Sequence, residues 1–316
     1  MPPNAAAALQ SVSLVGQNKT AVVVGGTLGI GAGVARLLAK LGCSRIIIVG
    51  RNETRGKAGL ETMKKLAPKG SNIVVEFVKA DLSDSKGMKN AATAIQEAAG
   101  DGGIDYLVMT QNGTPAGHNV KYNADGHDIA FAVQAISRFA LAYLLTTRGG
   151  LAENAIVMSV ANQGQTFPDL SIDDLSLKER LKEGETTLFM NQSKRDSMVL
   201  DSVFEELNIR YPQYRYYSLY PGLVKTEEFN FSIVPGFIKV LFWVGLKLIG
   251  TTPDQYAVFP VYILAAPDAQ KTLGSAKYFG RVLQPAELGA WAKVPKEPRS
   301  AVGKAIGNNR GDMMRF

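Results

Sequence analysis

The residues between 25 and 31 form a glycine-rich turn whose composition suits phosphate binding. Gly25, Gly29 and Gly31 follow the short apolar run TAVVVGG (20–26) and open the helical run GAGVARLLAKLG (31–42). Glycine has no Cβ, so a pyrophosphate can approach the backbone, and the helix N-terminus offers it N–H groups and a partial positive charge. The pattern therefore predicts a dinucleotide site, although a glycine turn without a ligand is the alternative. The residues expected to form it are Gly25, Thr27, Leu28, Gly29, Ile30 and Gly31.

The second apolar run, RIIIVG (45–50), ends on a basic residue instead of an acidic one. Sites that prefer NAD place an acid here to bind the ribose hydroxyls, whereas this chain has Arg51 and Asn52. A guanidinium pairs with a 2′-phosphate and stacks on adenine. We therefore expect NADP(H), with Arg51 and Asn52 as ligands; the alternative is a surface arginine that begins a loop.

Strands and helices alternate from residue 20 to about residue 225, and they must position these side chains. Apolar runs predict further strands at 72–83, 104–110, 154–159, 214–222 and 277–280. Helical spacing predicts helices at 56–67, 88–99, 127–146, 188–208 and 253–266. This alternation predicts an α/β fold with a doubly wound parallel sheet (Rossmann-type) in a single domain.

Composition limits the class of protein. The 316 residues carry a formal charge of +7, with 46% hydrophobic and 20% charged residues, as in ordinary soluble globular proteins. The basic residues form no block with interleaved aromatics, so we expect no nucleic-acid partner. Cys43 is the only cysteine, which excludes an internal disulfide and fits a reducing, cytoplasmic location. We read no signal peptide in residues 1–20 and assign no metal ligands.

The domain limits follow from the same patterns. We expect a flexible N-terminal segment at 1–18, a cofactor-binding and catalytic domain at 19–290, and a loosely held tail at 291–316 that is rich in Gly, Lys, Arg and Asn.

Several separated motifs resemble the short-chain dehydrogenase/reductase family, over residues from about 18 to about 285. Residues 24–31 match its glycine turn except for the leading threonine, and Asp81-Leu82 matches its adenine-contacting pair. Residues 110–113 look like its N-N-A-G loop with a degraded first half, and residues 221–226 match its P-G-x-V-x-T loop in full. The resemblance implies a homo-oligomer and further cofactor contacts from Asp81, Leu82, Asn112, Gly113, Pro221, Gly222, Val224 and Thr226.

Only some of the catalytic positions implied by the resemblance hold the residue type that the family uses. The family donates a proton from a tyrosine four residues before a lysine, holds the reacting oxygen with a serine, and keeps a proton path through an asparagine. Here Ser159 and Lys194 align with the serine and the lysine, Gln134 stands at the asparagine and Met190 replaces the tyrosine. Lys194 also binds the nicotinamide ribose in this family. Residues 165–187 and the helix after them look like the retinol-dehydrogenase-like branch.

Met190 cannot fill the tyrosine's role, because a thioether donates no proton. A positioned acid contributes roughly 10²–10⁴ in rate, so we expect another donor or another reaction. Tyr220, at the end of the sixth predicted strand, is the best substitute, and Lys194 acting through water is another. His118 and His127 suit a cap or surface position better than a catalytic one. Met190 also fits simple packing of the helix face.

The segment 231–250 is apolar but interrupted by Pro235-Gly236, Lys239 and Lys247. The resemblance implies a substrate lid at 227–250 and a hydrophobic small-molecule substrate. A helix resting on a membrane is a competing interpretation, which would give peripheral membrane contact, and a core helix is a third.

Three functions fit the sequence. The first is an NADPH-dependent oxidoreductase acting on a hydrophobic carbonyl or alcohol with non-standard proton donation. The second is the same scaffold catalysing a non-redox step such as isomerisation, dehydration or cyclisation. The third is a non-catalytic dinucleotide-binding protein.

Overall fold

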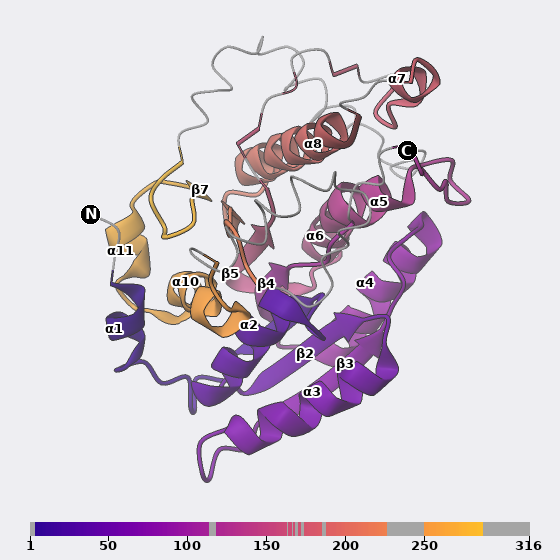
Figure 1. The fold of residues 1–316 in the computed structure, drawn as a ribbon. Helices are drawn as coiled ribbons and strands as arrows, with labels where there is room; N and C mark the ends of the chain where they lie inside the picture. The colour runs from indigo at the N-terminus through magenta and orange to yellow at the C-terminus, as the bar shows by residue number, and fades with distance from the viewer. Residues whose placement is uncertain are drawn as a thin grey trace.

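A computed structural model describes residues 4–113, 118–162, 164–165, 167, 170–171, 174–184, 188–225 and 250–286. Its centre is a parallel sheet with the strand order β3-β2-β1-β4-β5-β6-β7 (Figure 1). The strands are β1 (Thr20–Val24), β2 (Arg45–Gly50), β3 (Val74–Lys79), β4 (Ile104–Met109), β5 (Leu151–Val160), β6 (Arg215–Leu219) and β7 (Tyr278–Phe279). The order reverses between β1 and β4, so the predicted doubly wound sheet is confirmed.

The strands form because their side chains are buried on both faces of the sheet. All five residues of β1 are buried, and they alternate between two hydrophobic cores. Val22 and Val24 belong to one core, and Ala21 and Val23 to the other. Such continuous apolar runs are typical of parallel strands covered on both sides.

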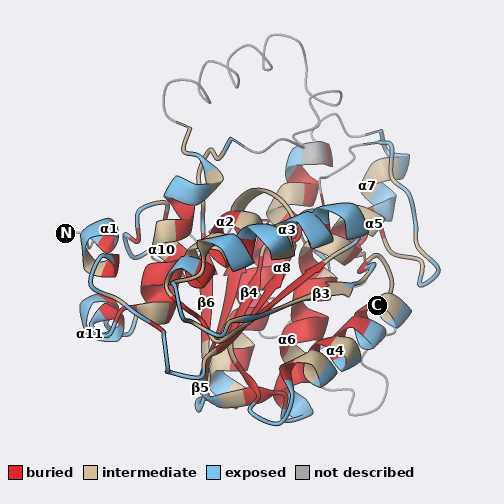
Figure 2. Ribbon diagram, turned by 90° about the horizontal axis from the view of Figure 1, so that it is seen from below, coloured by how far each residue is buried: buried red, intermediate tan, exposed pale blue. Residues whose placement is uncertain are grey.

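Helices cover both faces, as Figure 2 shows by the buried strands inside and the exposed outer helix surfaces. One core contains residues of α1 (Ala5–Leu9), α2 (Gly29–Lys40), α3 (Glu53–Leu66), α10 (Pro253–Ala265) and α11 (Ala269–Leu273). The other contains residues of α4 (Ser85–Ala99), α5 (Ile129–Phe131), the π-helix η1 (Ala132–Ile136), α6 (Ser137–Thr147) and α8 (Leu188–Arg210). A short helix, α7 (Lys178–Lys182), precedes α8.

Side-chain caps fix where several helices begin. Asn52 accepts a hydrogen bond from the Arg55 N–H at 2.9 Å and so caps α3. Thr252 and Gln255 form a reciprocal capping box at α10, which begins on Pro253. These caps satisfy N–H groups that have no partner inside the helix.

Two regions differ from expectation. The predicted helix 127–146 is continuous in its apolar pattern, but the structure interrupts it with η1. Within residues 4–18, α1 packs on α10, and Ala5, Leu9 and Leu14 are buried. The predicted lid at 227–250 lies almost wholly outside the described residues, and the tail 291–316 lies wholly outside them.

The segment Ile129–Thr147 is long and apolar enough to cross a membrane, and 61% of its most apolar stretch is buried inside the protein. It runs through α5, η1 and α6 against one face of the sheet, so its apolar character is explained by the core.

Cys43 lies just before β2 and is buried. Its Sγ lies 3.2 Å from the Lys19 carbonyl. Burial raises the pKa of this thiol to about 12, so it carries no charge at neutral pH.

Candidate active site

The glycine turn after β1 is pressed against the loop after β4. Gly25 has φ of +76°, and a Cβ there would lie 2.7 Å from the Gln111 nitrogen. A Cβ on Gly31 would lie 2.4 Å from both the Gly25 carbonyl and the Thr110 hydroxyl. Thr110 in turn donates to the Val24 carbonyl at 2.9 Å, which ties β4 to β1. The turn therefore has room for backbone alone, as the sequence predicts.

The N-terminus of α2 carries no side-chain cap. Leu28 occupies the cap position without a side-chain hydrogen bond, and the first turn holds no acidic residue. The first N–H groups of a helix need acceptors from outside the helix. Since this helix begins in the glycine turn at the point where the strand order reverses, its N-terminus is well placed to bind a pyrophosphate.

The residues predicted to bind the adenosine lie at the ends of β2 and β3. Arg51 is exposed directly after β2, whereas the side-chain oxygen of Asn52 is occupied as the α3 cap. Asp81 is exposed and accepts from the Ser83 N–H at 3.0 Å, and Leu82 is buried beside it. Thr27 lies over the end of β2, where a Cβ on Gly50 would lie 2.8 Å from the Thr27 methyl group.

The residues predicted to border the nicotinamide lie at the ends of β4 and β6. Asn112 is exposed, and the buried Gly113 donates its N–H to Oε1 of Gln134 at 3.0 Å. Pro221 and Gly222 follow β6, and Val224 pairs with Thr251 in an isolated bridge. Thr226 lies outside the described residues.

Gln134 sits inside η1, the single π-helical turn of the long helix. π-Helical turns are rare and are frequent at functional sites, because they redirect one side chain out of the regular helical stripe. The result here is a contact between Gln134 and the loop after β4, which the helical pattern alone does not predict.

Ser159 lies at the end of β5, next to Met109 of β4 and Ser218 of β6 in register. It is 1% exposed, and its hydroxyl accepts a hydrogen bond from Nη1 of Arg138 at 2.7 Å. The resemblance implies a serine that holds the substrate oxygen, whereas here one lone pair of the hydroxyl is engaged by a buried arginine.

Arg138 was not among the predicted site residues. Its guanidinium is buried and also donates to three carbonyl oxygens, those of Met109, Gln111 and Val160, at 2.6–3.1 Å. Burial lowers the pKa of Arg138 to about 9, and the Asp196 carboxylate opposes this shift. Arg138 therefore binds the ends of β4 and β5 together beneath the site.

The first two turns of α8 carry Met190 and Lys194. The side chain of Met190 is 52% exposed, so it is not packed in the core that the described residues form. Lys194 is half-buried. Between them, Ser193 accepts a hydrogen bond from Nδ2 of Asn162 at 3.2 Å, which fixes α8 to the loop after β5.

The alternative donors occupy different environments. Tyr220 is 40% exposed at the end of β6, where its N–H donates to the Phe279 carbonyl. His118 is exposed in a turn. His127 is half-buried, and burial lowers its pKa. Of these, Tyr220 alone directly follows β6, the strand that pairs with the Ser159 strand β5.

A polar cavity of about 120 Å³ lies between η1 and α8. Three of the predicted site residues line it, together with five that the sequence analysis missed. The lining residues are Asn112, Gly113, Gln134, Asn162, Ser193, Asp196, Ser197 and Leu200.

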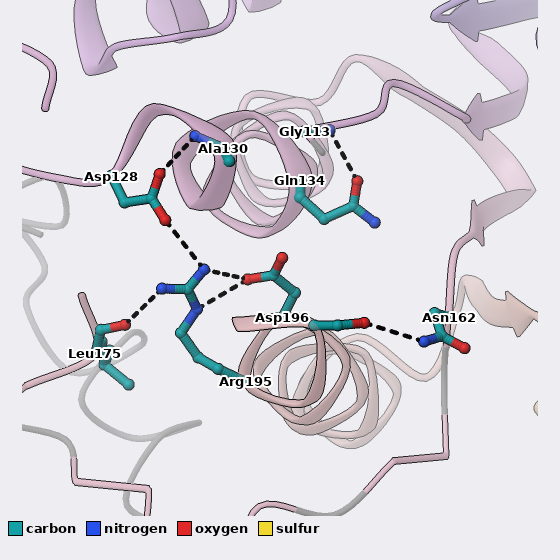
Figure 3. Close-up of polar contacts among 9 residues, drawn as sticks. Gly113, Asp128, Ala130, Gln134, Asn162, Leu175, Arg195 and Asp196 are labelled. Carbon is teal, nitrogen blue, oxygen red and sulfur yellow. Dashed lines mark hydrogen bonds and ion pairs between the residues drawn. The ribbon is translucent and has the colours of Figure 1, made fainter. Parts of the chain in front are cut away.

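Asp196 belongs to a cluster of buried charges beside this cavity (Figure 3). Arg195 donates from Nε and Nη2 to one oxygen of Asp196, at 2.9 and 2.8 Å. The same guanidinium reaches Asp128 at 3.4 Å and the Leu175 carbonyl at 3.2 Å, and it stacks 4.1 Å from the Phe131 ring centroid. A sequence signal existed: the adjacent Arg-Asp pair interrupts the apolar stripe of the α8 helix.

The chain is similar in sequence to known dehydrogenases and other oxidoreductases. Residues 19–152 match the family model described as short chain dehydrogenase. The chain is 29% identical over 234 residues to an oxidoreductase, AN1596, of Emericella nidulans, covering 73% of this chain and 66% of that protein. It is 26% identical over 280 residues to a polyprenol dehydrogenase of Danio rerio, covering 85% and 81%. The match thus spans about two thirds of the fungal relative's length.

Solved structures share the fold. A short chain dehydrogenase from Burkholderia cenocepacia in complex with NADP superposes with a TM-score of 0.56 at 16% identity, covering 83% of this chain and 95% of that one. The MalC reductase/Diels-Alderase from Malbranchea aurantiaca superposes with a TM-score of 0.57 at 18% identity, covering 78% and 90%. The sheet order and the glycine turn agree with the match of residues 19–152 to the short chain dehydrogenase model, so the chain is similar to short-chain dehydrogenases/reductases in sequence and in fold.

Proposed function

We propose that this protein is an NADPH-dependent oxidoreductase that acts on a hydrophobic carbonyl or alcohol without a tyrosine proton donor. The observation that carries the proposal is the uncapped N-terminus of α2, which opens in the glycine turn at the switch point of the sheet. Because such an N-terminus binds a pyrophosphate, it accounts for the cofactor.

The cofactor supplies or accepts a hydride when it is bound. The chain's own residues hold and orient it: α2 binds the pyrophosphate, Arg51 pairs with the 2′-phosphate, and Lys194 binds the ribose next to the nicotinamide. Arg51 supports NADPH over NADH because it is exposed at the end of β2, where an acid would repel the extra phosphate.

The class of substrate is inferred from the neighbouring positions. Met190 is exposed and apolar where the family places a hydroxyl, and it offers a surface for apolar packing beside the nicotinamide. The similarity to polyprenol dehydrogenases supports a long apolar substrate. A cytoplasmic homo-oligomer, with 231–250 as a lid or membrane contact, completes the proposal.

Binding calorimetry with NADPH and NADH tests the cofactor. We expect Arg51→Ala to weaken NADPH binding about 10- to 100-fold, which is about 1.4–2.7 kcal/mol, and to leave NADH binding unchanged. Arg148→Ala is the matched control, because Arg148 is exposed at the opposite end of the sheet. Equal weakening of both nucleotides, or none, would remove the assignment of Arg51.

Reduction of apolar aldehydes and ketones tests the reaction. Wild type should consume NADPH with such substrates, and Met190→Tyr should raise the rate by a factor within roughly 10²–10⁴ if it restores a positioned acid. An unchanged rate in Met190→Tyr would mean that another group already donates efficiently.

A non-redox reaction on the same scaffold is the second candidate. Two observations favour it: Met190 carries no proton, and the Ser159 hydroxyl is engaged by Arg138. The fold is also that of a protein described as a reductase/Diels-Alderase. Product formation without net NADPH oxidation would select this candidate, and NADPH binding without any turnover would leave a dinucleotide-binding protein.

A further inference from the structure

The site has no proton donor at the position where a tyrosine stands in the resemblance. Met190, which occupies that position, has no proton to give. Reduction of a carbonyl nevertheless requires one proton for each hydride. If the proposed function holds, the proton must come from another group that reaches the same end of the sheet.

The polar cavity between η1 and α8 reaches that end. Asn112 and Gly113, which line one side of it, belong to the loop after β4 that borders the predicted nicotinamide position. Ser193, on the other side, lies one helical turn after Met190 and directly before Lys194. At about 120 Å³, with several amide and hydroxyl groups in its wall, the cavity has the size and the polarity that ordered water requires.

Among the described residues, Asp196 is the one titratable group in the wall of this cavity. Its side chain is 5% exposed, and Arg195 engages only one of its oxygens with two N–H groups. Figure 3 shows the other oxygen directed toward Gln134, away from Arg195. One oxygen is thus anchored, and the other faces a group that also lines the cavity.

The charges around Asp196 come from each element packed against it. Arg195 contacts it from α8 itself, Asp128 faces the same guanidinium from the start of α5, and Arg138 faces it from α6. Burial raises the pKa of Asp196 to about 6; Arg195 and Arg138 oppose the shift, and Asp128 adds to it. A carboxyl group of this kind exchanges a proton readily near neutral pH.

We propose that the cavity is a proton-delivery site in which Asp196, acting through water, supplies the proton that a tyrosine at position 190 would otherwise give. This inference rests on the proposed function. Asp196 is then a positioning residue and not a catalytic one, because it acts on the reacting oxygen through water and does not touch it.

The step balances in atoms and electrons. The carbonyl carbon gains a hydride from NADPH, and the electron pair of the C=O π bond moves to the oxygen. That oxygen takes a proton from cavity water, which takes the proton of the Asp196 carboxyl group. Asp196 becomes a carboxylate paired with Arg195, and solvent returns one proton. The net change is carbonyl plus NADPH plus one proton to alcohol plus NADP⁺.

The test compares wild type with Asp196→Asn, Met190→Tyr and the double variant. Asp201→Asn is the matched control, because Asp201 is a buried aspartate of the same helix that does not line the cavity. Reduction of decanal and 2-undecanone is followed at saturating NADPH between pH 5.5 and 8.5, and NADPH affinity is measured on each variant.

We expect wild-type kcat to fall about tenfold per pH unit above the Asp196 pKa of about 6. Asp196→Asn should lower kcat about 10²-fold or more and flatten this profile while NADPH affinity stays within about twofold. The double variant should recover activity, because the tyrosine supplies the proton directly. Asp201→Asn should keep the wild-type pH profile.

Several results would overturn the inference. One is an Asp196→Asn variant with wild-type kcat and pH profile; another is a loss that Met190→Tyr does not rescue. If Asp196→Asn fails to fold, the wild-type profile decides alone, and a flat profile rejects Asp196. Wild type that binds NADPH but reduces neither probe removes the proposed function and this inference with it, whereas an active wild type with an indifferent Asp196→Asn removes only the inference.

Discussion

Two arginines are fully buried in the part of the chain that the structure describes, and each has its own oxygen acceptors. Arg138 donates to three carbonyls and to Ser159, and Arg195 donates to Asp196, Asp128 and the Leu175 carbonyl. A buried charge without partners is very costly. These contacts therefore stabilise the ends of β4, β5 and α8 only when all partners are present. The site is therefore held together by charges that do not touch the predicted cofactor.

Arg138→Met should show this dependence. The substitution keeps a long apolar side chain but leaves three buried carbonyls and a hydroxyl without their donor. We expect the free energy of unfolding to fall by about 3–5 kcal/mol, measured by urea denaturation. Arg148→Met, at the exposed C-cap of the same helix, should stay within about 0.5 kcal/mol. A loss below about 1 kcal/mol for Arg138→Met would contradict the structural role.

Asp196 should make stability depend on pH in an unusual direction. Its folded pKa of about 6 lies above the ordinary 3.8, so between these values the folded state binds more protons than the unfolded state. The contribution of this group to the free energy of unfolding is therefore largest below pH 4 and falls as pH rises through 6.

Asp196→Asn removes that dependence. We expect the stability of the variant relative to wild type to be higher at pH 7.5 than at pH 4.5, by at most about 3 kcal/mol. Urea titrations of both proteins at the two pH values measure the difference. The same relative stability at both pH values would show that Asp196 titrates normally.

At the scale of single elements, the glycine turn and the π-helical turn differ in how far the sequence predicts them. The glycine turn is predictable because the spacing of its glycines after an apolar strand is visible within one short stretch, even though the atoms that leave no room for a Cβ at Gly25 and Gly31 belong partly to the distant Thr110 and Gln111. The η1 turn is not, because the apolar spacing of 127–146 fits an unbroken helix equally well. Its partner, Gly113, lies 21 residues away in sequence.

The buried ion pairs were missed for a related reason. Arginine and aspartate are rarely buried unless they are paired, and Asp128 lies 67 residues from Arg195. A single sequence shows the residue types but not which of them meet. Ser159 lies near the end of β5 and Gln134 lies in η1 of the long helix, whereas the groups that engage their side chains were not predicted.

Gly31→Ala tests the glycine turn as an element. A Cβ at this position lies 2.4 Å from the Gly25 carbonyl and the Thr110 hydroxyl, so the turn must move away from β4. We expect NADPH affinity to fall at least tenfold, and the free energy of unfolding to drop by about 1–3 kcal/mol. Gly102→Ala, which meets nothing within 4 Å, should leave both unchanged. Wild-type affinity in Gly31→Ala would argue against pyrophosphate binding here.

At the scale of the whole molecule, one sheet separates two hydrophobic cores and gathers the site at a single edge. The glycine turn, Arg51 and the loop after β4 lie at that edge, while the polar cavity lies on the side covered by η1 and α8. The helices α2 and α10 pack closely on the opposite face. The cofactor is therefore expected to bind a surface that both cores support, so that binding and global stability are linked.

The rate of chemical labelling of the Cys43 thiol measures this link between binding and stability. Cys43 is the only thiol of the chain, and it is buried against Lys19 where β1 and β2 begin. A thiol reagent should modify it only after the sheet opens. The labelling rate in native buffer therefore reports how often the sheet opens. NADPH at about 100 times its dissociation constant should lower the labelling rate about a hundredfold. Equal labelling rates with and without NADPH would mean that the thiol is reached through a local opening. In that case the cofactor and the thiol would report on separate parts of the molecule.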